Sequence, residues 1–362
     1  MPVGVGADKL QNIPVSPYTQ DPASFFAMTS KNILTPRSLA APGPGASATA
    51  QLLQSGIVSK LQITFVGTLV VATAAVTTSD QWPYNLLKGF LLSANGQNNL
   101  WDCDGADLHS LRYARYPSYA EHTDVFPDVV GGGGSVATGT YTLSLTWEVP
   151  IAIDEVSLIG SLYAQSSATN LTAKLTQALN ADLFATNPAN ATIAGTFYVQ
   201  ETLFDIPIDG KGMIVIPDLT RLHGFNAVEF PVTNVGDARV PLIRSAGQLA
   251  RLLISARGSA TNRLSGLPNA ASTKKLNSLR LEYGGNQRPF TWDPISTLLS
   301  LNNQWYGAPL PYDRLAIDLL KENPPRDIIL MQGVTELAAV PNIGSGVTLT
   351  GAGVRLVQET LF

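Results

Sequence analysis

The chain has 362 residues, of which 45% are hydrophobic and only 14% are charged, and its formal net charge is −4. Charged residues usually make up about 25% of a soluble protein. Most of the exposed surface must therefore consist of small and neutral polar side chains, which are easily desolvated against neighbouring subunits. Direct nucleic-acid binding needs clustered cations, whereas the longest basic run is Lys274–Lys275. The composition argues against nucleic-acid binding and is compatible with extensive protein–protein contact.

The first 55 residues differ in composition from the rest. They contain seven prolines, and the stretch LAAPGPGASATA at 39–50 is typical of a linker. The first 17 residues lack the apolar core of a signal peptide. The single cysteine, Cys103, cannot form an intrachain disulfide, which favours folding in a reducing compartment. We expect residues 1–55 to be an extended arm on a protein that folds in the cytoplasm.

From residue 56 onward, strand-like segments alternate with Gly and Pro turn signals. Residues 61–79 carry no charge over the length of a membrane span, but their β-branched residues and two-residue alternation indicate a strand. Many short strands separated by such turns predict β-sandwiches or barrels. The expected strands cover residues 57–71, 84–93, 139–149, 156–164, 170–178, 193–206, 212–217, 225–233, 240–256, 276–283, 313–320, 328–340 and 347–361.

Two helices interrupt the strand pattern. In DGADLHSLRYAR, Asp107 is the expected N-cap. In WDPISTLLSLNNQWYG, Asp293 is the expected N-cap, Pro294 is at the first helical position and Gly307 lies just beyond the end. One helix falls in each half of the strand-rich region, which favours two similar sandwiches, each with one helix.

The sequence contains no recognisable catalytic motif. It has neither a G-x-S-x-G nucleophile elbow nor a G-x-x-x-x-G-K-[ST] phosphate loop. The three histidines, His109, His122 and His223, do not have the spacing of metal ligands. We therefore predict that the protein is not an enzyme and has no catalytic residue, no cofactor and no metal at these positions.

The segment DCDGAD at 102–107 is the best candidate for a cation site. Asp102, Asp104 and Asp107 could offer oxygen ligands to Ca²⁺. The glycine comes too early for an EF-hand loop, however, and no acidic residue follows at its last position. We interpret the segment as a turn leading into a helix, with a cation site formed by the three aspartates as the alternative.

Some carboxylates and aromatic residues of the chain are candidates for carbohydrate chemistry. Glu148 is a candidate for one of the two facing carboxylates of a glycosidase, but nothing marks a second, since Asp154 and Glu155 lie in the following turn. Large aromatic residues could line a sugar groove, although core packing is the better interpretation in a sandwich. These aromatic residues are Trp82, Tyr84, Trp101, Trp147, Trp292 and Trp305.

Residues 141–165 read YTLSLTWEVPIAIDEVSLIGSLYAQ and begin with strict two-residue alternation. From Leu145 onward, this stretch resembles a segment of tectivirus major capsid proteins. In that family a strand ending in Trp, Val and Pro leads through an acidic turn into the next strand. The residues that carry the resemblance are Trp147, Val149, Pro150, Ala152, Glu155, Leu158 and Gly160.

Three further stretches resemble the same family, in the same order. GIVSKLQITFVGTLV at 56–70 is similar to the first strand of its first jelly roll, residues 85–115 to the following strands and helix, and GMIVIPDLTRLHGF at 212–225 to the entry of the second jelly roll. The sequence after Arg257 departs most from the family. The resemblance implies an all-β fold of two side-by-side jelly-roll sandwiches, at 56–206 and 207–362, behind the arm at 1–55.

The resemblance also implies a function. Such proteins form pseudo-hexameric homotrimers that tile an icosahedral virus shell around an internal lipid membrane and a double-stranded DNA genome, with the arm on the inner side. The protein would then assemble in the host cytoplasm and reside in the virion. Its partners would be further copies, membrane lipids and vertex or minor capsid proteins. In the arm, Phe25, Phe26 and Met28 could anchor in the membrane and Lys31 could meet lipid phosphates, or the arm could pack under a neighbouring subunit.

Two alternatives remain at the level of sequence. A trimeric viral spike or receptor-binding β-protein would use an exposed aromatic platform to bind a host glycan. A jelly-roll glycosidase or lyase would need paired carboxylates.

Overall fold

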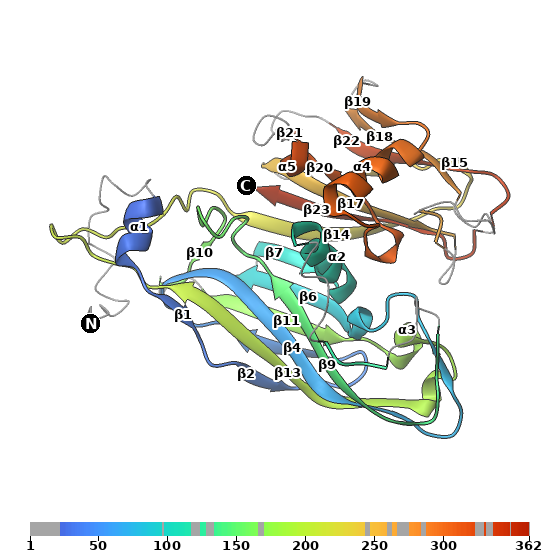
Figure 1. Cartoon of the computed structure of the whole chain (residues 1–362), viewed down its shortest axis with the longest axis horizontal. Coiled ribbons are helices and arrows are strands. Elements are labelled where there is room, and N and C mark those ends of the chain that lie inside the picture. The colour runs from blue at the N-terminus through green and yellow to red at the C-terminus, as the bar shows by residue number, and fades with distance from the viewer. Residues whose placement is uncertain are drawn as a thin grey trace.

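Two β-sandwiches lie side by side, and one sheet runs through both of them (Figure 1). His122 and most of the loop 258–275 lie outside the described residues. The computed structural model describes residues 22–95, 98–116, 124–127, 134–165, 170–242, 247–258, 263–265, 275–283, 287–322, 329–330, 336–347 and 349–361.

Three long antiparallel strands form the centre of a six-stranded sheet in the first sandwich. They are β4 (Ile57–Val71), β9 (Gly139–Val149) and β13 (Ala191–Phe204), and β4 lies between the other two. Alternate residues are buried along all three strands, because apolar side chains face the core and Thr, Ser and Gln face outward. The sheet is completed by β1 (Lys31–Ile33), β2 (Arg37–Ala40) and β10 (Leu162–Tyr163).

Two glycines give one aromatic ring its place in this core. Gly67 on β4 and Gly195 on β13 are paired across the two strands, and the ring of Phe65 lies over them. A Cβ atom on Gly195 would lie 2.5 Å from Cζ of Phe65 and 2.5 Å from the carbonyl oxygen of Val66. Glycine is required here because only a bare backbone leaves room for the ring.

The second sheet of the first sandwich continues into the second sandwich. β7 and β14 pair in parallel, with Trp101 opposite Phe225, and this pairing joins the two halves into a nine-stranded sheet. Its strands are β3 (Ser47–Gln51), β11 (Leu171–Gln177), β6 (Leu87–Ala94), β7 (Asn98–Cys103), β14 (His223–Pro231), β23 (Gly353–Leu361), β17 (Gln248–Arg257), β20 (Leu315–Asp318) and β21 (Ile329–Leu330).

A five-stranded sheet closes the second sandwich. It contains β15 (Gly236–Asp237), β16 (Val240–Pro241), β22 (Leu337–Ile343), β18 (Leu276–Tyr283) and β19 (Gln287–Trp292). Each sandwich has its own large apolar core, one around Trp147 and the other around Leu279. The first core also includes Leu253, Ala316 and Val357 of the second sandwich, so apolar packing continues across the boundary between the two halves.

Of the segment expected to be an extended arm, residues 29–55 are extended and their strands are paired with the first sandwich, whereas residues 1–21 lie outside the described part of the chain. β1 and β2 pair with β13, and β3 pairs with β11, so the segment passes from one sheet to the other along one side of the sandwich. Glu201, on the buried face of β13, accepts a hydrogen bond from the Leu53 backbone at 3.0 Å and lies 3.5 Å from the Arg37 guanidinium. These contacts fasten both ends of the β2–β3 segment. α1 (Pro22–Met28) precedes it.

The predicted first helix forms, but its N-cap is Asp104 and not Asp107. α2 (Gly105–Arg115) begins with a capping box, in which the Asp104 side chain accepts the Asp107 N–H at 2.8 Å and the Asp107 side chain accepts the Asp104 N–H at 3.0 Å. Asp107 is thus three residues inside the cap. A first-turn aspartate also fits the positive end of the helix dipole.

The second predicted helix, α4 (Ser296–Tyr306), also forms, although Asp293 is not its N-cap. The carbonyl of Ile295 accepts the Leu299 N–H at 3.1 Å, so Ile295 occupies the cap position and offers no side-chain acceptor. Gly307 ends the helix in the left-handed conformation, with φ of 73°, as its position predicted.

Two predicted strands are largely turns. In 156–164 only β10 is a strand, because the Asp154 carboxylate accepts the N–H groups of Val156 and Ser157 and bends the chain. In 212–217 a single bridge forms between Ile208 and Ile214. The remaining short elements are β5 (Val76–Thr78), β8 (Ser135–Val136), β12 (Phe184–Thr186), α3 (Asn180–Leu183), α5 (Leu319–Glu322) and the 3₁₀ turns Tyr84–Leu86, Pro188–Asn190 and Pro311–Asp313.

The charge-free segment at 61–79 lies mainly in β4, which confirms the strand interpretation. In the part of the chain that the structure describes, no helix is long and apolar enough to cross a membrane.

Candidate functional site

The two sandwiches are joined by buried charged side chains, which no sequence motif had indicated. Glu359 on β23 is 0% exposed, and its carboxylate accepts hydrogen bonds from Arg115 of α2 at 2.6 Å and from Arg251 of β17 at 2.7 Å. Nε2 of His223 lies 3.0 Å from the same carboxylate, and Arg251 also donates to Asp318 at 2.8 Å. We call these five residues the Glu359 cluster.

The electrostatics of the Glu359 cluster favour full ionisation of its acid. Burial alone would raise the pKa of Glu359, but the guanidinium groups of Arg251 and Arg115 outweigh it and hold the pKa well below its usual range. The other ring nitrogen of His223, Nδ1, also has partners, because it lies 3.0 Å from the carbonyl oxygens of Pro150 and Ile151. The cluster therefore joins α2 and the turn after β9 to four strands of the second sandwich, β14, β17, β20 and β23.

A second buried cluster, the Asp107 cluster, contains Asp104, Asp107, Arg314 and Arg355. Arg314 lies 2.5 Å from the Asp107 carboxylate, Arg355 donates to the same carboxylate, and Arg355 also lies 2.9 Å from Asp104. Burial raises the pKa of Asp107, but Arg355 and Arg314 outweigh this effect and hold it below its usual range. Both arginines come from the second sandwich, so this cluster too links the halves.

The same contacts answer the question of a cation site at 102–107. The carboxylates of Asp104 and Asp107 are engaged by arginines and by the capping box. Among the described residues, no group of three or more His, Cys, Asp or Glu side chains could hold a metal ion. The segment functions as a helix start and an ion-pair partner.

Each of the carboxylates considered for sugar chemistry binds a partner of its own. Glu148 pairs with Lys60 at 2.8 Å, Asp154 caps its own turn, and Glu155 lies 3.9 Å from Lys31. None of these contacts sets two carboxylates opposite each other across a cleft.

The aromatic residues pack as core side chains, as predicted for a sandwich. Trp101 is 0% and Trp147 1% exposed, while Trp305 and Trp292 are half-buried against the two cores. An exposed aromatic platform of the kind that binds sugars is therefore not formed by these residues.

The residues expected to contact lipid or a neighbour lie at one end of the molecule, where α1 is found (Figure 1). We call it the arm end. The arm end also contains the turn at 150–161 and the linker at 205–222. The Ala152 N–H donates a hydrogen bond to the Ser59 carbonyl, and a β-bridge between Gly160 and Leu222 joins the turn to the linker. Leu361, the residue before the last, pairs with His223 at this end.

The structure does not leave Phe25 free to act as an anchor, because it is 0% exposed. Its ring packs edge-on against Phe26 and Phe204, with centroids 5.6 and 6.1 Å away. Phe26 is half-buried in the same small core, whereas Met28 is 40% exposed. The sequence had suggested an apolar anchor made of these three side chains, but only Met28 is clearly exposed.

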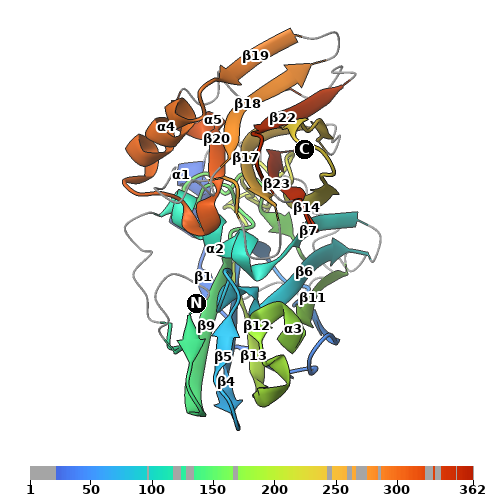
Figure 2. The ribbon, with the colours of Figure 1, turned by 90° about the vertical axis from the view of Figure 1, so that its right-hand side faces the viewer.

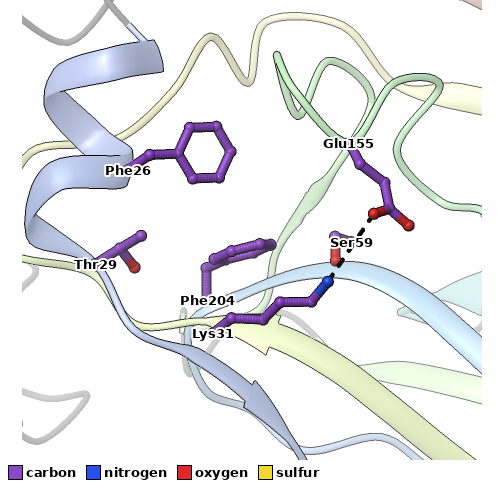
Figure 3. Close-up of a pocket in the computed structure, with 6 residues that line it drawn as sticks. All are labelled: Phe26, Thr29, Lys31, Ser59, Glu155 and Phe204. Atoms are coloured by element: carbon purple, nitrogen blue, oxygen red, sulfur yellow. Dashed lines mark ion pairs between the residues drawn. The ribbon is translucent and has the colours of Figure 1, made fainter.

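A hollow of about 330 Å³ lies beside α1 (Figure 3). Phe26 and Phe204 form its apolar wall, and Lys31 and Glu155 face each other at 3.9 Å on its other side. The Lys31 ammonium also lies 5.9 Å from the centre of the Phe204 ring. A second hollow of about 460 Å³, between the sandwiches, shares Glu155 and is bordered by Arg115 and Lys321.

Exposed apolar side chains gather at the arm end. Val156 is 75% exposed, Ile33 64%, Met28 40%, and Leu53 and Leu222 38% each. Exposed apolar side chains favour contact with another apolar surface. This end of the molecule is therefore suited to meet another surface.

Comparisons with known proteins identify the fold. No family model and no curated protein sequence matches the chain. The capsid protein in the atomic structure of Sulfolobus turreted icosahedral virus is similar with a TM-score of 0.69 and 17% identity, over 92% of this chain and 90% of that one. The Faustovirus major capsid protein is similar with a TM-score of 0.58 and 8% identity, over 92% of this chain and 90% of that one. The major capsid protein P2 of bacteriophage PM2 is similar with a TM-score of 0.51 and 11% identity, over 92% of this chain and 97% of that one. The chain thus has the double jelly-roll fold of these capsid proteins, which confirms the predicted fold class.

Proposed function

We propose that the protein is the major capsid protein of an icosahedral virus. The observation that carries this proposal is the extent of the fold match: over 90% of this chain is covered, together with 90–97% of the three capsid proteins named above. Little of the chain is therefore left over for another activity. The chemistry of the described residues agrees with a structural role, since the buried acids and bases are paired with one another.

We further propose that three copies form a trimer with a pseudo-hexagonal outline, which tiles the shell through lateral contacts. The two side-by-side sandwiches of one chain supply two of six similar units around the trimer axis. The low charged fraction supports broad lateral contact, because few ions need to be desolvated.

The arm end is proposed to face inward, over an internal membrane. The exposed side chains of Val156, Met28 and Leu222 at this end support this orientation, because apolar side chains gain free energy at a lipid surface. Lys31 is half-exposed and its ion pair with Glu155 is loose, so it can reach a lipid phosphate. Membrane lipids and vertex or minor capsid proteins are then partners besides the protein itself, and the location is the virion shell after assembly in the host cytoplasm.

The solution mass of the expressed protein tests the capsid proposal. We expect light scattering to give three times the chain mass of 38.4 kDa, and electron microscopy to show particles with hexagonal outlines. A chain that stays monomeric at high concentration would contradict the proposal.

The membrane part is tested separately by flotation of the assembled protein with vesicles. We expect binding to weaken when Val156 and Met28 are replaced by Asn. Equal binding of this variant would contradict the inward orientation of the arm end while leaving the capsid role intact.

A further inference from the structure

The outer face of the six-stranded sheet carries no charged side chain in its central part. Outward-facing residues alternate along 64–70 of β4, 140–146 of β9 and 192–198 of β13, and they are Thr, Ser, Ala, Val and one Tyr. We call these residues the neutral face. The register places them in continuous rows across the three strands, and the pair Lys60–Glu148 lies beyond its edge, toward the arm end.

The equivalent sheet of the second sandwich has a different surface. There Arg280 donates to Asp237 and to Glu282, both at 2.6 Å, and Arg239 donates to Glu336 at 2.7 Å. Both surfaces are outer faces of antiparallel sheets in similar sandwiches, so the fold alone does not require one of them to be neutral. The absence of charge on the neutral face therefore has a cause other than the fold, such as a binding function of that face.

The neutral face is accessible in the single chain. Figures 1 and 2 both place β4, β9 and β13 on the side of the molecule opposite β18 and β19. Thr68, Thr142 and Ala194 are exposed, and Val66 and Val70 are 45% and 38% exposed. The described residues of the chain itself therefore leave the centre of this face open to solvent.

The size of the neutral face suits a protein contact. With β2 beside β13, four strands about 4.8 Å apart and rows spanning some eight residues give roughly 500 Å². One partner in a standard protein–protein interface buries about 800 Å². The face can thus supply more than half of a stable contact.

We propose that the neutral face binds a second copy of this chain, an inference that rests on the capsid function proposed above. A nucleic acid or an anionic lipid surface would require cations, which the face lacks. A neighbouring copy fits better, because the chain itself is charge-poor and two uncharged surfaces lose little hydration free energy on contact. The rows of Thr and Ser also supply short hydroxyl groups that can bond across such a contact.

The test introduces charge without disturbing the fold. Thr68 and Thr142 are exposed and directly opposite each other on β4 and β9, so Thr68→Lys with Thr142→Lys places two cations at the centre of the face. The matched control replaces both residues by Val, which has the same shape and no charge. Lys174→Glu on the exposed side of β11 controls for a change of charge elsewhere. Circular dichroism and thermal unfolding verify that all variants fold.

Sedimentation velocity and electron microscopy then compare assembly with the unchanged protein. We expect the Lys variant to need about a hundredfold higher concentration to assemble, since unpaired buried charges cost several kcal/mol, while both controls assemble normally. Loss of trimers would place the face within the trimer, and loss only of larger arrays would place it between trimers; either result supports the proposal. Normal assembly of the Lys variant would overturn it and leave the capsid function standing. If the unchanged protein never self-associates, both fail.

Discussion

Replacement of Glu359 by Gln tests whether the buried ions hold the two sandwiches together. Gln has nearly the same shape, but it removes the negative charge that Arg115 and Arg251 approach to 2.6 and 2.7 Å. Glu359 is 0% exposed and the side chains of Arg115 and Arg251 are only 9% and 4% exposed, so water replaces the lost carboxylate poorly. Removing one partner of a buried ion pair typically costs about 3–5 kcal/mol, and we expect the free energy of unfolding to fall by about that amount.

Urea denaturation followed by tryptophan fluorescence measures this loss. Trp101 is a suitable probe, because its ring lies 5.0 Å from the ring of His223 in the same region. Glu336→Gln is the matched control: this acid pairs with Arg239 at 2.7 Å at the surface, where its side chain is 47% exposed, and such pairs contribute at most about 1 kcal/mol. If Glu359→Gln loses no more stability than the control, the cluster does not hold the halves together.

Three further results are expected from the same structure. The folded protein holds the pKa values of Glu359 and Asp107 below their usual values of 4.5 and 3.8. As the pH falls, the unfolded chain therefore takes up protons at these two carboxylates before the folded protein does. The free energy of unfolding measured by urea denaturation should be full at neutral pH and decline below about pH 4. Gly195→Ala should destabilise by about 1–3 kcal/mol through overpacking, whereas Gly210→Ala, which meets open space, should not. Phe25→Ala should lower the unfolding temperature, because removal of a buried Phe ring typically lowers the free energy of unfolding by about 3–5 kcal/mol. An unchanged unfolding temperature would instead mean that Phe25 is free to act as a membrane anchor.

Local patterns predicted the long strands well. β4 and β9 have the bounds expected from two-residue alternation, because their two faces meet different environments along their whole length. The arm was predicted as extended, but its pairing was not foreseen. β2 pairs with a strand more than 150 residues later, and no feature within 37–40 indicates that partner.

The charged clusters lay beyond what one sequence can indicate. Arg115 and Glu359 are 244 residues apart, and Arg355 and Asp107 are 248 apart, so only the packing of the two sandwiches brings them together. One local signal was available: Asp104 and Asp107 have the three-residue spacing of a capping box, although Asp at both ends is less usual than Ser or Thr with Glu.

The placement of charge also fits a charge-poor chain in the proposed role of shell subunit. Ions are concentrated where α2 meets β17, β20 and β23, and a buried ion pair tolerates little change in geometry, because a shifted guanidinium leaves a carboxylate unpaired. We expect these ion pairs to restrict the angle between the sandwiches more than apolar packing alone would. In the proposed shell, each copy presents both sandwiches to its neighbours, so an error in this angle would be passed on from copy to copy. In that shell the interior charges would fix the shape of the subunit, and the neutral face would keep the desolvation cost of its contacts with other copies low.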